Sequence, residues 1–514
     1  MANVEISAPR STIARRPSHS GVPAPREVRS VYIPYRGDKD VASPLPSLPP
    51  SAYPSTTNMA DLKDEYAHEE ERVGTPPQSS PDMSRNSSMA HFDIDEAGGR
   101  ELPSLPPVDR GAKAYSFLAA ATLVETVVWG LPFSAGVLHE YWMSHMFPDN
   151  DSTLTMAATL QTSLMYMSAA FLGPMFTAIP QWSKPLQWVG LLVATASLIA
   201  SAFVSQAWHL IVTIGIFYPF AGALYLPCAT LVYEWFQDRR GMATGIQMSG
   251  TGVGGVVYPL VVSALLSRFG YKATMISLGL GFFALNAGAL CFIRRRIPLG
   301  KGGARRNRPK VDYSFLKHPA VWIGMAVIMC TCMGNFIPSL WIPTFADVVH
   351  ARKPNGTALV AIMNAASVPG NAVMGYISDR YPSRYVVPAS CTTAAVACLL
   401  LWGFSAGVTA EGCLTAFAVV WGFTALSFVG LWSKMITVIS KDDPNLPGLL
   451  FSLFTILKGV GNLTSGPIST ALLKGGAFAG AAGAYGKTNY GSLLIYTGVT
   501  TFGASLFAAF FPKK

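Results

Sequence analysis

The chain contains few charged residues after position 110. The 404 residues from 111 to 514 hold 26 Lys or Arg and 12 Asp or Glu, so less than a tenth of them are charged. Soluble domains usually reach about a quarter. This scarcity excludes an ordinary water-soluble enzyme or binding domain for most of the chain.

Patterns typical of a metal site, a disulfide framework or a catalytic centre are missing as well. The seven cysteines are odd in number, lie in apolar stretches and show no CxxC spacing. The histidines after position 110 are scattered, and no Ser/His/Asp set or paired carboxylates occur within plausible reach of one another. We therefore expect no enzyme activity, no cofactor or metal ion, and no nucleic-acid partner.

The beginning of the chain has a different composition. Residues 1–110 carry 16 of the 37 prolines, 12 basic and 16 acidic residues, and almost no apolar periodicity. Such a segment cannot bury enough surface to offset its ordering entropy, so residues 1–112 are predicted to be a disordered cytoplasmic tail. The first 30 residues lack the apolar core of a signal peptide.

Two features of this tail favour contacts with other proteins. Leu-Pro-Ser-Leu-Pro-Pro occurs at 45–50 and again at 102–107, and extended Pro-rich segments suit aromatic-lined adaptor grooves. Ser-Pro or Thr-Pro pairs at positions 43, 75 and 80 suit kinases. We expect adaptor or kinase contacts here, with a solvated spacer as the alternative.

Apolar stretches of about 20 residues recur from Ala114 onward, and each can cross ~30 Å of hydrocarbon as a helix. The sequence predicts an all-α membrane protein with twelve such helices in two six-helix bundles, at 113–293 and 321–514, joined by a basic linker at 294–320. The predicted spans are 115–141, 153–178, 186–205, 209–234, 241–266, 273–293, 321–345, 357–377, 386–406, 412–438, 447–472 and 489–511.

Basic residues are distributed unevenly between the predicted loops. With the N-terminus in the cytoplasm, the inner loops and C-terminus hold 17 Lys or Arg and the outer loops hold six. Positive residues favour the cytoplasmic side, so both termini are predicted to be cytoplasmic. The expected location is the plasma membrane. The basic linker is expected to contact anionic membrane lipid, although an ordinary stop-transfer role also explains it.

The sequence shows no nucleotide-binding loop. Gly250-Thr251-Gly252-Val253-Gly254-Gly255 matches GxGxxG but lies inside a predicted span instead of at a strand-to-helix turn. Gly486-Lys487-Thr488 has Ala481 where a phosphate-binding loop needs its first Gly. An ATP-driven pump is therefore disfavoured.

An internal repeat links the two predicted bundles. At an offset of 207 residues, three glycines of the fifth span match three of the eleventh: Gly241, Gly252 and Gly254 with Gly448, Gly459 and Gly461. Glycines let helix backbones approach closely where lipid offers no hydrophobic drive for association. Two parallel six-helix repeats indicate a carrier whose site lies between the halves near the midplane.

Several motifs stand out in and between the predicted spans. They are Glu125-x3-Trp129-Gly130-Leu131-Pro132, Glu234-Trp235-Phe236-x2-Arg239-Arg240-Gly241-Met242-Ala243-Thr244-Gly245, Ile342-Pro343-Thr344-Phe345, Asn364-Ala365-Ala366-Ser367-x2-Gly370, Gly375-x3-Asp379-Arg380-x3-Arg384 and Asn462-Leu463-x2-Gly466-Pro467. As a set they resemble the fungal, monocarboxylate-transporter-like branch of the major facilitator superfamily. The resemblance covers residues 114–512 and implies the major facilitator fold with transport by alternating access.

The chain departs from that branch at particular positions. An Asp–Arg pair assists proton-linked carboxylate transport in the animal carriers, and the corresponding places here look like Ser367 and Asn371. The first-half counterpart of the gating motif, Gly173-x3-Thr177, has no Asp.

Two ionisable residues are predicted to lie deep in the membrane, where a charge costs at least ~2.5–3.5 kcal/mol. Glu125 lies about ten residues into the first span and Lys458 about eleven into the eleventh, so both are expected roughly 15–17 Å deep. We expect Glu125 to take and release a proton during transport, and Lys458 to face an anionic cargo or to pair with Glu125. The alternative is that each satisfies a neighbouring helix permanently.

Other polar or aromatic residues within spans are weaker cavity candidates, because they also serve as packing or helix-to-helix contacts. They are Trp129, Asn335, Asn364, Asn371 and Trp432. Asp379, Arg380 and Arg384 are expected to form a cytoplasmic gating loop whose charged contacts break when the halves rock, with a solvated loop as the alternative.

Together these features predict a secondary active transporter that moves a small organic acid or related metabolite, coupled to protons. A non-transporting nutrient sensor with a carrier fold and an efflux carrier for a secondary metabolite are the alternatives.

Overall fold

The structure, a computed structural model, describes residues 105–297, 314–351, 353–406, 410–441, 443, 446–475, 478, 480–486 and 489–512. Helices make up nearly all of this part of the chain, and none of it forms a strand. The predictions for residues 1–104 and for the middle of the basic linker lie outside the described residues.

The first half of the bundle comprises helices of α, π and 3-10 type, several of which follow one another directly to form one span. They are α2 (Ala112–Phe133), α3 (Ala135–Tyr141), η2 (Trp142–Met146), α4 (Asp151–Met167), α5 (Ala169–Ala178), α6 (Ser183–Ser201), α7 (Ala207–Leu210), η4 (Ile211–Phe217), η5 (Tyr218–Ala221), α8 (Gly222–Trp235) and α9 (Arg240–Phe292).

The second half repeats this organisation. Its helices are α10 (Pro319–Val348), α11 (Gly356–Arg380), α12 (Ser383–Val396), η7 (Ala397–Trp402), α13 (Ala410–Thr424), η9 (Leu426–Leu431), α14 (Trp432–Ser440), α15 (Leu446–Lys474) and α16 (Tyr490–Ala509).

The predicted number of spans agrees with the helices. Nine continuous helical stretches of the described chain are long and apolar enough to cross a membrane, and a tenth candidate consists of two arms, Ser152–Ala178 and Pro180–Ser201, bent by 115°. One of the nine, α9, joins two helices across Gly270, whose backbone is non-helical at φ 73°. Counting the arms of α9 and of the bent pair separately gives twelve.

Helix α9 doubles back at Gly270. Arg295, just after its end, forms an ion pair of 2.6 Å with Glu234, just before its start, so both ends of α9 lie together. The positive φ at the bend is a conformation that only glycine adopts readily.

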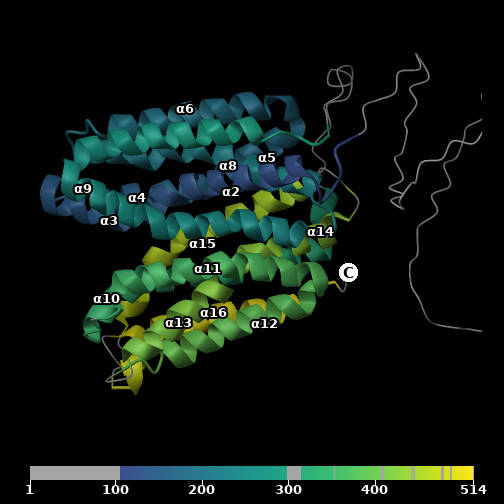
Figure 1. The fold of residues 1–514 in the computed structure, drawn as a ribbon. Coiled ribbons are helices and arrows are strands. Elements are labelled where there is room, and N and C mark those ends of the chain that lie inside the picture. The colour runs from purple at the N-terminus through teal and green to yellow at the C-terminus, as the bar shows by residue number, and fades with distance from the viewer. Residues whose placement is uncertain are drawn as a thin grey trace, which may run out of the picture. The chain divides into compact units, whose positions relative to one another are not determined.

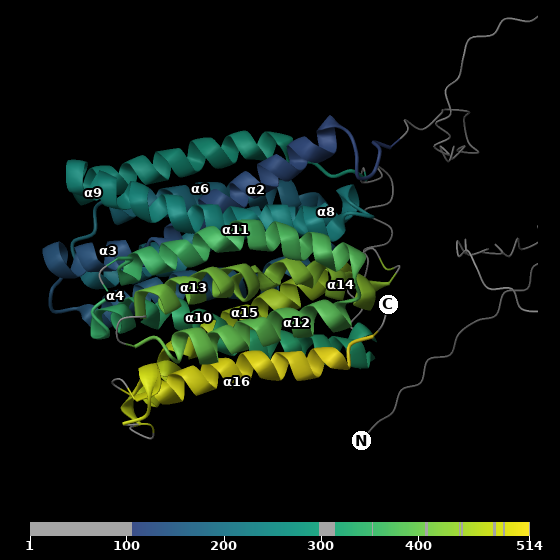
Figure 2. The ribbon, with the colours of Figure 1, turned by 60° about the horizontal axis from the view of Figure 1, so that its bottom comes forward.

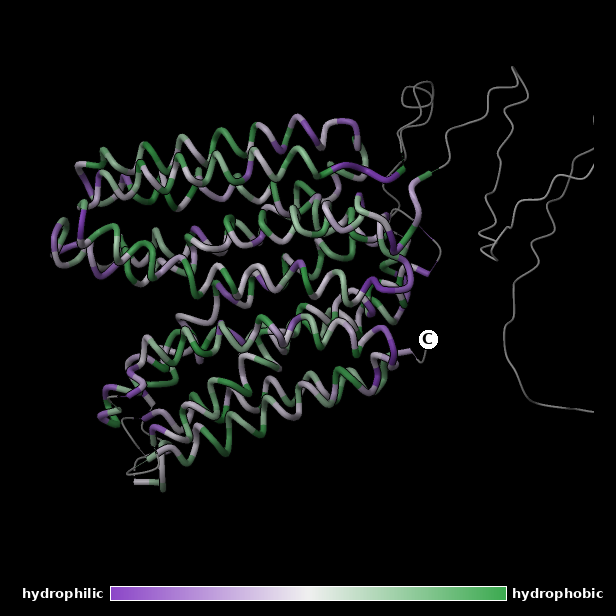
Figure 3. The backbone as a smooth tube through the Cα atoms, viewed as in Figure 1, coloured by the Kyte–Doolittle hydropathy of each residue, from purple (hydrophilic) through white to green (hydrophobic). Residues whose placement is uncertain are grey.

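Both chain ends of the described bundle lie at the same end of the molecule, where α2 begins and α16 finishes (Figure 1). This end is called the termini end below. Apolar residues follow the helices along their length, while hydrophilic residues concentrate at the helix ends and connections (Figure 3). That distribution suits helices whose backbone groups are satisfied internally within lipid.

The glycine repeat has the same role in both halves. A Cβ at Gly252 of α9 would collide with Ser367 of α11, and one at Gly459 of α15 would collide with Tyr166 of α4, so each glycine faces the opposite half. Gly254 and Gly461 lie instead against α2 and α10 within their own halves. The structure thus contains two matching bundles that meet along α9–α11 and α15–α4, and the turned view shows α11 between α9 and the rest of the second half (Figure 2).

Candidate functional site

Aromatic side chains from both halves gather around the middle of the bundle. The rings of Trp129 and Tyr166 are 4.4 Å apart, those of Trp129 and Tyr225 are 5.4 Å apart, and Tyr166 also contacts Phe336 at 6.3 Å. With Trp432 these residues are called the central aromatic cluster. Helices α2, α4 and α8 of the first half and α10 and α14 of the second half contribute to it.

Lys458 of α15 points its ammonium group into this cluster. Its Nζ lies 5.1 Å from the ring centre of Tyr166, 5.9 Å from that of Trp432 and 6.0 Å from that of Phe336. Aromatic faces attract a cation, and more strongly where water is scarce. The rings therefore stabilise a positive charge on this ammonium group.

Glu125 of α2 is completely buried beside the same cluster. Its Oε1 accepts a hydrogen bond of 3.2 Å from Nε2 of Gln247 on α9, and Oε2 has no hydrogen-bond partner within the described chain. The carboxyl group lies near Trp129 and within electrostatic range of Lys458, but no ion pair joins it to Lys458 in the described residues. The structure therefore brings the two predicted residues to one region without pairing them.

The predicted asparagines serve contacts between and within helices. Nδ2 of Asn335 donates a hydrogen bond of 2.9 Å to the carbonyl of Ala425. Nδ2 of Asn371 donates one of 3.0 Å to the carbonyl of Ser367, one turn earlier in α11. Asn364 lies against Gly255 of α9, across the boundary between the halves. Within the described chain Oδ1 of Asn371 has no hydrogen-bond partner, so this buried oxygen is free to accept a bond.

The predicted gating loop holds the two halves together at the termini end. Asp379, near the end of α11, accepts two hydrogen bonds from the start of α9. Its Oδ1 accepts one of 2.7 Å from the backbone N–H of Gly241, and its Oδ2 accepts one of 2.8 Å from that of Met242. These groups, called the latch below, place a carboxylate at the positive N-terminus of α9. Further along the same contact, Ser249 of α9 donates 2.7 Å to the carbonyl of Val368.

The two arginines of the gating loop make local contacts. The guanidinium of Arg380 lies 4.3 Å from the ring centre of Tyr376, and that of Arg384 lies 4.8 Å from that of Tyr385. Neither forms an ion pair with another described residue in this arrangement. Their predicted role in gating stays a prediction.

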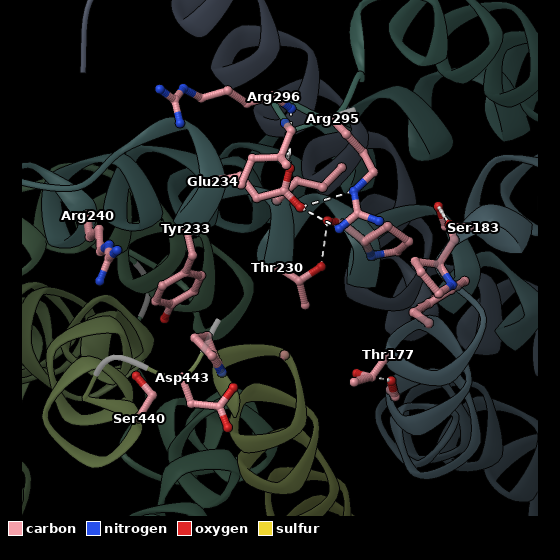
Figure 4. A pocket seen from close by; sticks show the side chains of 18 of the residues that line it. Thr177, Ser183, Thr230, Tyr233, Glu234, Arg240, Arg295, Arg296, Ser440 and Asp443 are labelled. Atoms are coloured by element: carbon pink, nitrogen blue, oxygen red, sulfur yellow. Dashed lines mark hydrogen bonds and ion pairs between the residues drawn. The ribbon is translucent and has the colours of Figure 1, made fainter. Parts of the chain in front are cut away.

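A cavity of about 700 Å³ lies at the termini end between the halves. Thr177 and Thr230 line it from the first half, and Ser440 and Asp443 from the second (Figure 4). Its wall contains more basic than acidic groups: Arg240, Arg295, Arg296 and Lys441 against Glu234 and Asp443. A cavity of this character favours the entry of anions.

Sequence reasoning missed the residues that surround the two charges. Gln247 had a usable signal, because it is a long polar side chain inside an apolar span and faces Glu125. Tyr166, Tyr225 and Phe336 had none, because aromatic residues are common in spans and these lie far apart in the sequence. Within the described chain, no group of three His, Cys, Asp or Glu residues gathers as metal ligands.

The arrangement offers three chemical properties at one level of the bundle. The central aromatic cluster contacts flat or apolar groups, Lys458 supplies a positive charge, and Glu125 is a buried group that can hold or release a proton. Because these groups come from both halves, a relative movement of the halves changes the positions of the rings, Lys458 and Glu125 relative to one another.

Comparisons with known proteins agree with this architecture. MFS transporter asaE of Aspergillus flavus is 27% identical over 415 residues, which cover 80% of this chain and 89% of that protein. Riboflavin transporter MCH5 of Saccharomyces cerevisiae is 25% identical over 458 residues, 84% of this chain and 85% of that protein. A variant of the Escherichia coli fucose:proton symporter FucP covers 78% of this chain and all of its own at 12% identity, with a TM-score of 0.57, which shows a shared fold.

The fungal monocarboxylate-transporter-like branch stays a prediction, since these relatives do not single it out. The family model of the Major Facilitator Superfamily matches residues 118–466. With twelve helical arms, two matching halves and this match across most of the bundle, the chain belongs to the major facilitator superfamily of membrane transporters.

Proposed function

We propose that this chain is a secondary active transporter that moves an organic anion by alternating access, coupled to the binding of a proton at Glu125. The observation that carries the proposal is the ammonium group of Lys458, held among rings from both halves and close to an unpaired buried carboxyl group. A permanent structural pair would bring the two charges into contact. Here they stay apart, which suits two separate ligands.

The surrounding rings support an anion with an aromatic or apolar body as the cargo. Rings such as those of Trp129, Tyr166 and Trp432 gain energy by stacking against flat groups. The relative named as a riboflavin transporter agrees with a cargo that has a flat ring system, but not with the negative charge, because riboflavin is uncharged at neutral pH. A small organic acid of monocarboxylate size would also bind to the positive charge of Lys458, but it would make fewer contacts with the rings of the central aromatic cluster.

The basic cavity at the termini end supports the same charge preference. Together with the excess of Lys and Arg in the loops of this end, it favours a cytoplasmic orientation of both termini in the plasma membrane.

Transport into proteoliposomes tests the proposal. We expect a panel of labelled organic anions to include at least one that accumulates faster when a pH gradient is imposed, while matched neutral metabolites do not. Accumulation of neutral compounds alone would contradict the assignment of Lys458.

The variant Glu125→Gln tests the proton site. It should remove the stimulation by the pH gradient while keeping exchange of labelled for unlabelled anion, because exchange needs no net proton movement. Glu140→Gln makes the same chemical change at an exposed position and should behave like the unaltered protein. Full stimulation in the Glu125 variant would remove this residue from the coupling mechanism.

A further inference from the structure

Residues 105–111, called the strap below, lie across the termini end before α2 begins. Arg296, which follows α9, donates 2.9 Å from Nε to the carbonyl of Pro106. Asp109 donates 3.0 Å from its backbone N–H to the carbonyl of Trp235 at the end of α8. The strap is therefore attached to the end of α8 and to the segment that follows α9.

The side chain of Asp109 binds the turn that leads into α9. Its Oδ1 accepts hydrogen bonds of 3.0 Å from the backbone N–H of Gln237 and 3.2 Å from that of Arg239. Its Oδ2 accepts one of 3.0 Å from the backbone N–H of Asp238. Asp109 is only 9% exposed and has a left-handed backbone at φ 58°. Three successive N–H groups thus converge on one nearly buried carboxylate, which is a specific arrangement and not a chance surface contact.

The latch begins two residues further along the same backbone. Asp109 accepts hydrogen bonds from the backbone N–H groups of residues 237, 238 and 239. Asp379, from the opposite half, accepts those from residues 241 and 242. The N-terminus of α9 therefore binds two carboxylates. Asp109 belongs to the same half as α9, whereas Asp379 belongs to the other half and must leave when the halves separate. The direction of the Gly241 and Met242 N–H groups depends on the conformation of the turn before them.

We propose that Asp109 is a positioning residue for the latch: by fixing turn 236–239 it aims the N–H groups of Gly241 and Met242 at Asp379 and so stabilises the state closed at the termini end. The proposal rests on the alternating access inferred above. It assigns to the segment preceding the first span a part in setting how often this end opens.

Labelling of a buried cysteine tests the proposal without any substrate. Ser378 is 1% exposed and lies against Gly241 across the two halves, so Ser378→Cys should react with a maleimide only when the latch opens. The background carries serine at the native cysteines that are exposed or half-buried, Cys291, Cys330 and Cys413. The full chain is labelled in lipid nanodiscs.

Asp109→Ala should raise the labelling rate about fivefold, the effect of losing about 1 kcal/mol of capping energy. Asp379→Asn should raise it at least as much, and the double variant should react no faster than Asp379→Asn alone, since Asp109 acts through Asp379. Asp109→Asn keeps the oxygen that accepts from Gln237 and Arg239, so it should stay within about twofold of the unaltered protein.

Asp238→Asn is the matched control. It removes a negative charge from the same turn, but its side chain is exposed and forms no hydrogen bond or ion pair within the described chain, so labelling should not change. If Asp109→Ala fails to fold, Arg296→Ala, which releases the strap at Pro106, should raise labelling about twofold.

An unchanged or slower rate in Asp109→Ala, with the expected increase in Asp379→Asn, would overturn the positioning role and leave alternating access standing. Simple addition of the two effects in the double variant would also overturn it. No change in either single variant would contradict the latch itself and, with it, the proposed transport cycle.

Discussion

At the scale of single residues, the centre of the bundle contains two buried ionisable side chains that do not pair with each other. Lys458 is surrounded by Tyr166, Phe336 and Trp432, and Glu125 accepts one hydrogen bond from Gln247. Cation–π contacts of this kind contribute about 2 kcal/mol each where water is scarce, which makes a buried ammonium tolerable without a carboxylate partner. The charge can then be used for a ligand.

The variant Lys458→Met should weaken binding of the anion that gives the largest uptake in the panel by at least ~10-fold, since a charged hydrogen bond contributes about 1.5–3 kcal/mol. Lys458→Arg should recover part of the affinity, because it keeps the charge in a different shape. Equilibrium binding to the purified protein measures both.

Lys272→Met provides the control. Lys272 also lies over an aromatic ring, that of Phe203 at 4.5 Å, but it is exposed at the surface of the bundle. Its replacement should leave affinity unchanged. Equal losses in the two methionine variants would argue against a ligand at Lys458.

At the scale of elements, α9 carries most of the contact between the halves. Gly245 and Gly252 lie against backbone atoms of α11, whereas Gly250 lies against α2 beside Glu125. The second arm of α9 differs, because a Cβ at Gly281 would meet open space. One helix therefore presents a bare backbone to two neighbours that belong to different halves, which permits close approach without interlocking side chains.

The variant Gly245→Ala should reduce maximal uptake at least ~10-fold, a loss that corresponds to about 1.4 kcal/mol. The added methyl group overlaps the carbonyl oxygen of Asn371 and forces α9 away from α11. Initial uptake rates at saturating anion measure the effect.

Gly281→Ala adds the same methyl group to the same helix where space is open, so its uptake should match the unaltered protein. Normal uptake in Gly245→Ala would mean that the halves do not need this close contact.

The sequence predicted the helices because apolar stretches of about 20 residues are long enough to cross lipid. It predicted the two central ionisable residues because a charge inside such a stretch is costly and therefore rare. It indicated Trp129 and Trp432 only as weaker candidates and could not predict Tyr166 and Phe336, which are ordinary residues for a span and meet the others only through tertiary packing. Asp109 was hidden for the opposite reason. In a segment rich in charge and proline, one more aspartate has no distinguishing pattern, and only the folded turn at 236–239 gives it a role.

At the scale of the whole molecule, the halves touch near the termini end through the latch and through Gly448, which lies against Thr230 and Thr177. The helices diverge toward the opposite end (Figure 1). The described contacts thus close the end at which the chain enters and leaves the bundle, and they hold the strap against the same end.

Deletion of residues 2–104 should leave uptake per copy of protein within about twofold, because the strap and the latch stay intact. Deletion of residues 2–111 should alter it severalfold, because Asp109 is lost. Uptake normalised to reconstituted protein measures both. A non-transporting sensor would instead show no uptake with or without the tail and would lose its signalling output when residues 2–104 are removed.

The bend of α9 has a mechanical consequence. Since a single glycine, Gly270, joins the two arms, there is no intervening loop to absorb displacement. Any tilt that the first arm undergoes as it leaves α11 must be passed on to the arm that follows, which packs on α6. We therefore expect a tilt of the first arm to move the second arm as well, at the outer side of the first half.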